Sequence, residues 1–139
     1  MLVIIRDFLF FICFISVSYF SFGSEVIFTK TVTNITQASE ASTVLEGRPG
    51  DVIEYNIDLF NGTDDAISNI QLVSAVPPFT VLAAVINCNN SDLPSTLRCD
   101  VRTPDGVNQV GYQGAIRWQL VGKLGVGHRA RVSYQVIIK

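Results

Sequence analysis

A strict alternation of apolar and polar residues between residues 50 and 60 constrains this chain more than any other feature. Ile53, Tyr55, Ile57 and Leu59 alternate there with Glu54, Asn56 and Asp58. Successive side chains of a β-strand point to opposite faces, so this pattern predicts a strand with one dry face and one wet face. The same alternation returns over residues 129–138, with apolar side chains at the even positions. Two such strands in 139 residues favour an antiparallel β domain.

Strand and turn signals follow one another along the rest of the chain at intervals of about 8–12 residues, as in a β-sandwich. Asn61-Gly62 is typical of a tight hairpin turn. Outside residues 1–23 no window has the apolar spacing of a helix. We therefore predict an all-β, antiparallel sandwich of seven or eight strands. The expected strands are 26–33, 43–45 (a short edge strand), 50–60, 67–75, 80–86 (a central strand), 98–102, 115–121 and 129–138.

The apolar members of these strands predict a single core. Its expected residues are Phe28, Ile53, Tyr55, Ile57, Leu59, Ile70, Leu72, Leu82, Trp118, Leu120, Leu124, Val132, Tyr134 and Val136.

Residues 1–23 form a separate segment, in which Arg6 and Asp7 are the only charges. Its apolar run is shorter than the roughly 20 residues of a membrane-spanning helix. Small residues stand at the two positions that a signal peptidase reads, the second being Gly23. We predict a cleavable N-terminal signal helix, removed after Gly23, and a folded domain over residues 24–139. The alternative is an uncleaved segment that anchors the chain in a membrane.

The cysteines agree with export, because Cys13 leaves with the signal and Cys88 and Cys99 remain as an even pair. In a secreted chain such a pair predicts a disulfide, here worth roughly 3 kcal/mol. Two free thiols in a reducing compartment are the alternative.

Two cysteines and one distant histidine do not make a zinc site. The net charge of -2, without a basic cluster, gives no reason to expect nucleic acid.

The order of signals from residue 50 to the C-terminus resembles a known family. The residues that carry the likeness are Gly50-Asp51, Tyr55, Asn61-Gly62, Pro77, Trp118 and Leu124-Gly125-Val126-Gly127, followed by the alternating last strand. This succession resembles the bacterial conserved repeat domain, also called domain of unknown function 11. The resemblance implies an immunoglobulin-like sandwich in the periplasm, on the cell surface or secreted, with no catalytic residues to carry over.

This chain departs from the family pattern at the proline. Ser74-Ala75-Val76 stand where the family has an aspartate and a threonine, and Pro78-Phe79 replace the usual glycine. The family often occurs in several copies, whereas this chain carries one.

The segment 87–113 is predicted to be a long loop that the disulfide pins. Binding residues concentrate on loops of a rigid sandwich. Asn108, Gln109 and Tyr112 are therefore the candidate residues for contact with a partner, which we expect to be an envelope or surface protein or a glycan.

Other candidate sites have plainer interpretations. His128, the only histidine, lacks an expected nucleophile, and Asp64-Asp65 supply too few oxygens for calcium. Arg117, Arg129 and Arg131 are expected together on an outer face. There they keep the sheet soluble or, alternatively, bind an anionic glycan or partner. Trp118 is expected in the core rather than as a sugar platform.

The sequence thus predicts an exported, non-enzymatic binding or structural module without a cofactor. Membrane contact is expected only through an uncleaved signal segment. An alternative is a pilus-like assembly subunit whose strand 26–33 adds to a neighbour's sheet. A hydrolytic enzyme would need a cleft of convergent titratable groups, which the sequence does not indicate.

Overall fold

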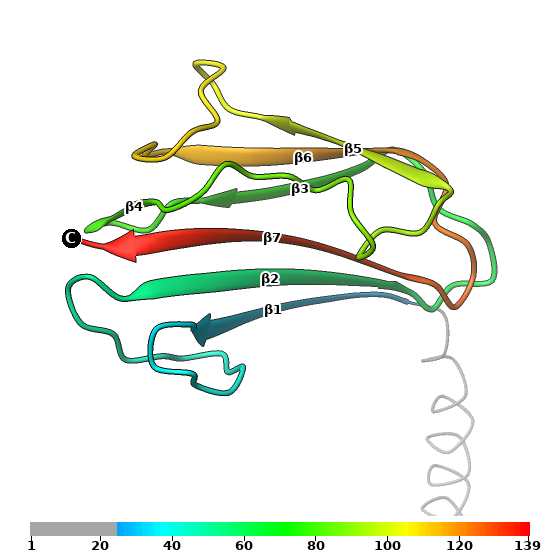
Figure 1. Cartoon of the computed structure of the whole chain (residues 1–139). Coiled ribbons are helices and arrows are strands. Elements are labelled where there is room, and N and C mark those ends of the chain that lie inside the picture. The colour runs from blue at the N-terminus through cyan, green and yellow to red at the C-terminus, as the bar shows by residue number, and fades with distance from the viewer. Residues whose placement is uncertain (1–24) are drawn as a thin grey trace, which may run out of the picture.

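The computed structural model describes residues 25–139, which form two stacked antiparallel sheets (Figure 1). The strands are β1 (Val26–Asn34), β2 (Val52–Asn61), β3 (Ile70–Ala75), β4 (Thr80–Leu82), β5 (Leu97–Arg102), β6 (Ala115–Gly122) and β7 (Arg129–Ile138). One sheet has the order β1-β2-β7-β4 and the other β3-β6-β5. The prediction of an antiparallel all-β structure of seven or eight strands is confirmed, with seven strands observed. Between residues 25 and 139 no helix is long and apolar enough to cross a membrane, and the predicted signal segment lies outside the described residues.

The core lies between the sheets and contains most of the residues that alternation predicted. The centre of the larger sheet is the β2–β7 pair, in which Ile57 stands opposite Val132 and Ile53 opposite Val136. These side chains are buried, and so is Trp118 from the other sheet. Twofold periodicity identifies them because both sheets are antiparallel and each has one face in water.

Two predicted core residues differ from expectation. Phe28 stands opposite Leu59 and therefore shares the inner face, but it is 54% exposed. Its position at the start of β1, an edge strand of the larger sheet, explains this exposure. Tyr55 is half-buried and packs against the core from its margin.

The tight hairpin predicted at Asn61-Gly62 is wrong, because β2 and β3 belong to different sheets. The chain crosses there from one layer to the other. Asn61 is fully buried, and its Nδ2 donates hydrogen bonds to the carbonyls of Asp65 at 2.8 Å and Leu124 at 2.9 Å. The asparagine therefore fastens the crossing to the β6–β7 connection.

The central strand predicted over residues 80–86 is also wrong. Only β4 forms, at the edge of the larger sheet. On its outer side Leu82 donates to the carbonyl of Tyr112 and accepts from the amide of Gly111, at 2.9 and 2.8 Å. A loop thus covers the apolar run that looked like a central strand.

No strand forms over residues 43–45, where a short edge strand was predicted. The chain meets β1 there only through the isolated pairing of Val32 with Ser42.

The strand order differs from that of an immunoglobulin constant domain in one respect. That fold places its first, second, fifth and fourth strands in one sheet and its third, sixth and seventh in the other. Here the seventh strand pairs with the second, and the fifth pairs with the sixth. The two layers are alike, but the fifth and seventh strands have exchanged sheets.

Candidate ligand-binding groove

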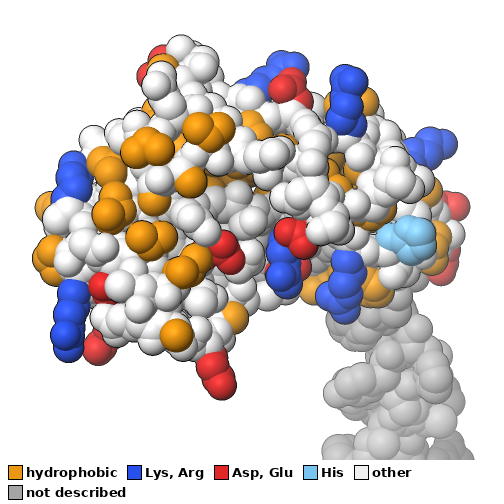
Figure 2. All heavy atoms as spheres, viewed as in Figure 1, with side chains coloured by type: hydrophobic (Ala, Val, Ile, Leu, Met, Phe, Trp, Pro, Cys, Tyr) orange, Lys and Arg blue, Asp and Glu red, His pale blue; other side chains and the backbone are white. Residues whose placement is uncertain are grey.

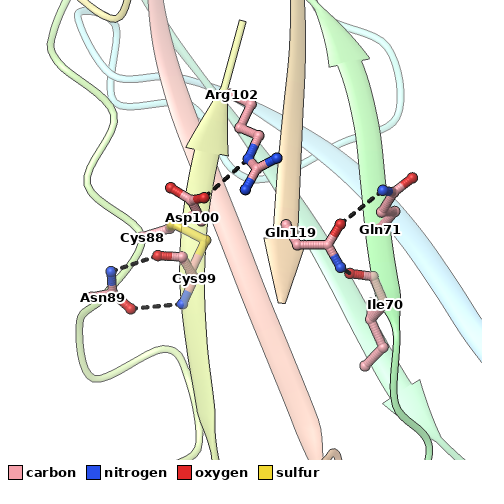
Figure 3. Close-up of polar contacts among 8 residues, drawn as sticks. All are labelled: Ile70, Gln71, Cys88, Asn89, Cys99, Asp100, Arg102 and Gln119. Atoms are coloured by element: carbon pink, nitrogen blue, oxygen red, sulfur yellow. Dashed lines mark hydrogen bonds and ion pairs between the residues drawn. A yellow bond between two sulfur atoms is a disulfide. The ribbon is translucent and has the colours of Figure 1, made fainter. Parts of the chain in front are cut away.

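The segment between β4 and β5 is fastened to β5 by two neighbouring residues. Cys88 and Cys99 form the predicted disulfide, with their Cα atoms 5.8 Å apart. Next to it, Asn89 Nδ2 donates to the carbonyl of Cys99 and Asn89 Oδ1 accepts from its amide, both at 2.7 Å (Figure 3). The side-chain amide thus takes the place of a neighbouring strand, a role that the sequence did not reveal.

The three predicted contact residues have different surroundings. Asn108 Oδ1 accepts from the amide of Ile86 at 2.9 Å, and its Nδ2 donates to the carbonyl of Ile86 at 3.0 Å. Tyr112 is only 7% exposed, and its hydroxyl donates to the carbonyl of Ala115 at 2.8 Å. Gln109 is exposed. Two of the three side chains therefore hold the loop in shape, and Gln109 is the one presented to solvent.

The predicted grouping of Arg117, Arg129 and Arg131 is wrong. Arg117 lies on β6, whereas the other two lie on β7 in the opposite sheet. Arg131 Nε pairs with Asp58 Oδ1 at 2.8 Å, and the Arg129 guanidinium lies 4.7 Å from the centre of the Phe60 ring. Consecutive strands suggested a common face, but the connection between β6 and β7 crosses between the layers.

Arg117 instead stands directly opposite Arg102 in the β5–β6 ladder. Like charges in opposite positions destabilise a sheet. Arg102 Nε bonds Asp100 Oδ2 at 3.0 Å, as Figure 3 shows, whereas Arg117 forms no ion pair within residues 25–139. One of two facing guanidinium groups is thus left without a counter-charge.

A groove of about 340 Å³ lies beside these two arginines on the outer face of the smaller sheet. Its walls are formed by Val73, Arg102, Thr103, Pro104, Ala115, Ile116 and Arg117. Val73 is 60% exposed and therefore presents apolar surface to solvent beside the two arginines. The volume is within the range of small-ligand sites, about 300–1,000 Å³. The groove therefore combines two guanidinium groups with an apolar floor.

Such a combination can hold a carboxylate or sulfate by paired hydrogen bonds from a planar guanidinium. On the larger sheet, Glu54 accepts a hydrogen bond from Gln135 at 3.0 Å and Asp58 pairs with Arg131, so these two carboxylates already have partners. Within residues 25–139 no three His, Cys, Asp or Glu side chains lie together in a way that could hold a metal ion.

Sequence reasoning missed Arg102 and Val73 as members of a site. The alternation of Arg98, Asp100 and Arg102 was visible, but their position beside Arg117 depends on how β5 pairs with β6. Comparison with family models, curated proteins and solved structures finds no match to this chain. The function of the protein is therefore inferred from the groove at Arg102, Arg117 and Val73.

Proposed function

We propose that this chain is an exported, non-enzymatic binding module of the bacterial cell envelope or surface, immunoglobulin-like in type. Its contact surface is the groove between Val73, Arg102 and Arg117. The resemblance over residues 50–139 and the Cys88–Cys99 disulfide support the location, because disulfides persist in oxidising compartments.

The main support for a binding role is the pair of arginines, Arg102 and Arg117, that face each other across β5 and β6. An acidic group of a partner would lie between Arg102 and Arg117, relieve their repulsion and receive hydrogen bonds from Arg117. The apolar floor around Val73 would pack against the body of the same ligand. The partner is therefore an envelope or surface protein, or a glycan, that presents carboxylates beside apolar surface.

Binding to a defined acidic polymer tests this role. Immobilised polygalacturonate is the glycan probe and poly-glutamate the polypeptide probe. We expect Arg102→Gln combined with Arg117→Gln to weaken binding at least about tenfold, since each lost charged hydrogen bond is worth about 1.5–3 kcal/mol. Arg98→Gln is the matched control, because Arg98 lies on the same strand face but outside the groove walls. Equal binding by the double variant and the control would contradict the proposal.

Export has its own measurement. The intact mass of the protein recovered from the periplasm or medium reports whether residues 1–23 are removed. A deficit of two hydrogens reports the disulfide.

A second candidate function, assembly by strand addition, is favoured by the edge of β1. Val26, Ile27 and Phe28 are 44%, 52% and 54% exposed. Among residues 25–139, backbone pairing covers this edge only at Val32, through Ser42. Light scattering over a range of concentrations distinguishes the two roles, because strand addition predicts a mass that rises with concentration and falls again in Phe28→Lys. A monomer at all concentrations would leave only the binding module.

A further inference from the structure

The inner face of the larger sheet is covered by two different structures. Over part of its length the smaller sheet lies on it and buries Ile57 and Val132. Towards the C-terminal end of β7 the segment 42–47 forms the cover instead. Thr43, Leu45 and Gly47 from this segment face inner-side residues of the sheet.

Two adjoining hollows, of about 200 and 210 Å³, remain beneath this cover. They share Val32, Thr43 and Tyr55 in their walls. Each strand of the larger sheet contributes to the floor, through Val32, Ile53, Tyr55, Thr80, Val136 and Ile138. We call the two adjoining hollows together the channel. Its walls mix threonines with apolar side chains, and its apolar floor at Ile53 and Val136 suits an aliphatic chain.

Lys30 stands at one end of this channel and lines the second hollow. Its Nζ donates to Ser74 Oγ at 2.9 Å and Tyr134 OH at 3.3 Å, and lies 4.9 Å from the centre of the Tyr55 ring. None of these groups is an anion, and Lys30 forms no ion pair among the described residues. Partial burial lowers the pKa of Lys30, because the charged amine loses hydration.

The cover forms few backbone hydrogen bonds, although its Leu45 packs against the core. Val32 and Ser42 exchange two backbone hydrogen bonds, of 2.7 and 2.9 Å. Beyond them, residues 43–47 form no backbone–backbone hydrogen bond with any described residue. Segments with few such bonds open at low cost in free energy.

We propose that this channel binds a single-chain aliphatic carboxylate. The carboxylate pairs with Lys30, and the alkyl chain lies between Leu45 and the floor at Ile53. Two features indicate this ligand. An anion supplies the counter-charge that Lys30 lacks among the described residues, and the apolar residues next to Lys30 favour a hydrocarbon chain attached to that anion. The floor of this site lies on the inner face of the larger sheet, Lys30 and Thr43 are exposed at its margin, and the site is separate from the groove at Arg117.

Calorimetric titration of the exported protein with sodium decanoate, below the concentration at which micelles form, tests the proposal. We expect saturation at one decanoate per chain. Nonyltrimethylammonium, with the same alkyl chain and the opposite charge, should bind at least about tenfold more weakly, as one lost charged contact predicts. Lys30→Met should weaken decanoate binding by a similar factor, whereas Lys123→Met, on an exposed lysine outside the channel walls, should not.

The position of the ligand is measured on the unaltered protein, so the test does not depend on whether Lys30→Met folds. Methyl signals of Leu45, Ile53 and Ile138 should shift on titration with decanoate, and the Val73 signals should not. Absence of saturable binding, equal affinity for the two head groups, or shifts confined to Val73 would each overturn the proposal.

Hydrophobic side chains also gather over β4 and the end of β7 in Figure 2. Shifts confined to the exposed Phe79 and to Val81 of β4 would likewise count against the channel.

Discussion

Asn34 Nδ2 donates a hydrogen bond to Asp51 Oδ2 at 2.8 Å, and both side chains are buried. The same carboxylate oxygen accepts from the backbone amide of Arg48 at 3.0 Å and from Gln37 Nε2 at 2.7 Å. Asp51 thereby joins the end of β1 to the turn before β2. The backbone hydrogen bond from Arg48, followed by that from Asn34, lowers the pKa of Asp51 below its usual value.

This lowered pKa predicts loss of stability in acid. Because the folded carboxyl binds a proton less readily than the unfolded one, its contribution is complete above the unfolded pKa of about 3.9. The contribution disappears as the pH falls through the lower folded pKa. Urea unfolding from pH 6 to pH 2 should show a decline that Asp51→Asn makes shallower, while also lowering stability at neutral pH. Glu46→Gln, on an exposed carboxylate, should leave the slope unchanged.

Asn61→Ala should be strongly destabilising. It removes one of the two hydrogen bonds that each of the carbonyls of Asp65 and Leu124 accepts, takes the Oδ1 acceptor away from Thr63, and empties a fully buried position. We expect the free energy of unfolding to fall by about 2–3 kcal/mol. Asn56→Ala on the outer face, where the side chain makes only a 3.4 Å contact with Glu54, should change it by less than about 0.5 kcal/mol. Similar losses in the two variants would show that Asn61 does not fasten the crossing between the sheets.

Gly122→Ala should cost more than the same change at Gly106. Both glycines have positive φ, 116° and 74°, so each substitution strains the backbone by about 1–2 kcal/mol. At Gly122 the new Cβ would also collide with the carbonyl oxygen of Thr96, whereas at Gly106 it would meet nothing within 4 Å. In thermal unfolding, Gly122→Ala should therefore have a clearly lower midpoint temperature than Gly106→Ala. A lower midpoint for Gly106→Ala would contradict the close contact between Gly122 of β6 and Thr96.

Phe79 occupies a turn position that suits glycine or asparagine. Its φ is 64°, and the amide of Thr80 donates to the carbonyl of Pro77 at 3.2 Å across the turn. The side chain is 81% exposed, so replacing it removes little packing. Phe79→Asn should raise stability by up to about 1 kcal/mol, because asparagine tolerates this conformation. Phe79→Val should lower stability, since a β-branched residue tolerates it least. Chemical denaturation of the two variants measures the difference, and a loss in Phe79→Asn would oppose this account.

Parts of the fold were predictable because they depend on local properties. The last strand was predicted over residues 129–138 and observed as Arg129–Ile138. The disulfide followed from an even pair of cysteines. The prediction of a hairpin at Asn61 was wrong for a non-local reason. The same Asn-Gly dipeptide can connect two strands of one sheet or two strands of different sheets. The run at 80–86 failed because apolar side chains do not reveal whether a strand or a loop will cover them.

The candidate sites depended on strand pairing even more. Arg117 and Arg102 are separated by the whole loop that precedes β6, and only the β5–β6 ladder makes them neighbours. Lys30 reads as an ordinary strand lysine until its contact with Ser74, on the opposite sheet, is known. No periodicity in the sequence could reveal either relationship.

By itself, the order of residues determined where most strands run and which side chains turn away from water, because side-chain direction in an extended chain repeats every two residues. The tertiary structure decided which strands are neighbours and how far each layer extends. Phe28 is an example: alternation correctly directs its side chain to the inner face, yet it remains exposed at the start of an edge strand. Burial depends on what a distant part of the chain places over a residue, and that contact is formed only when the two layers pack.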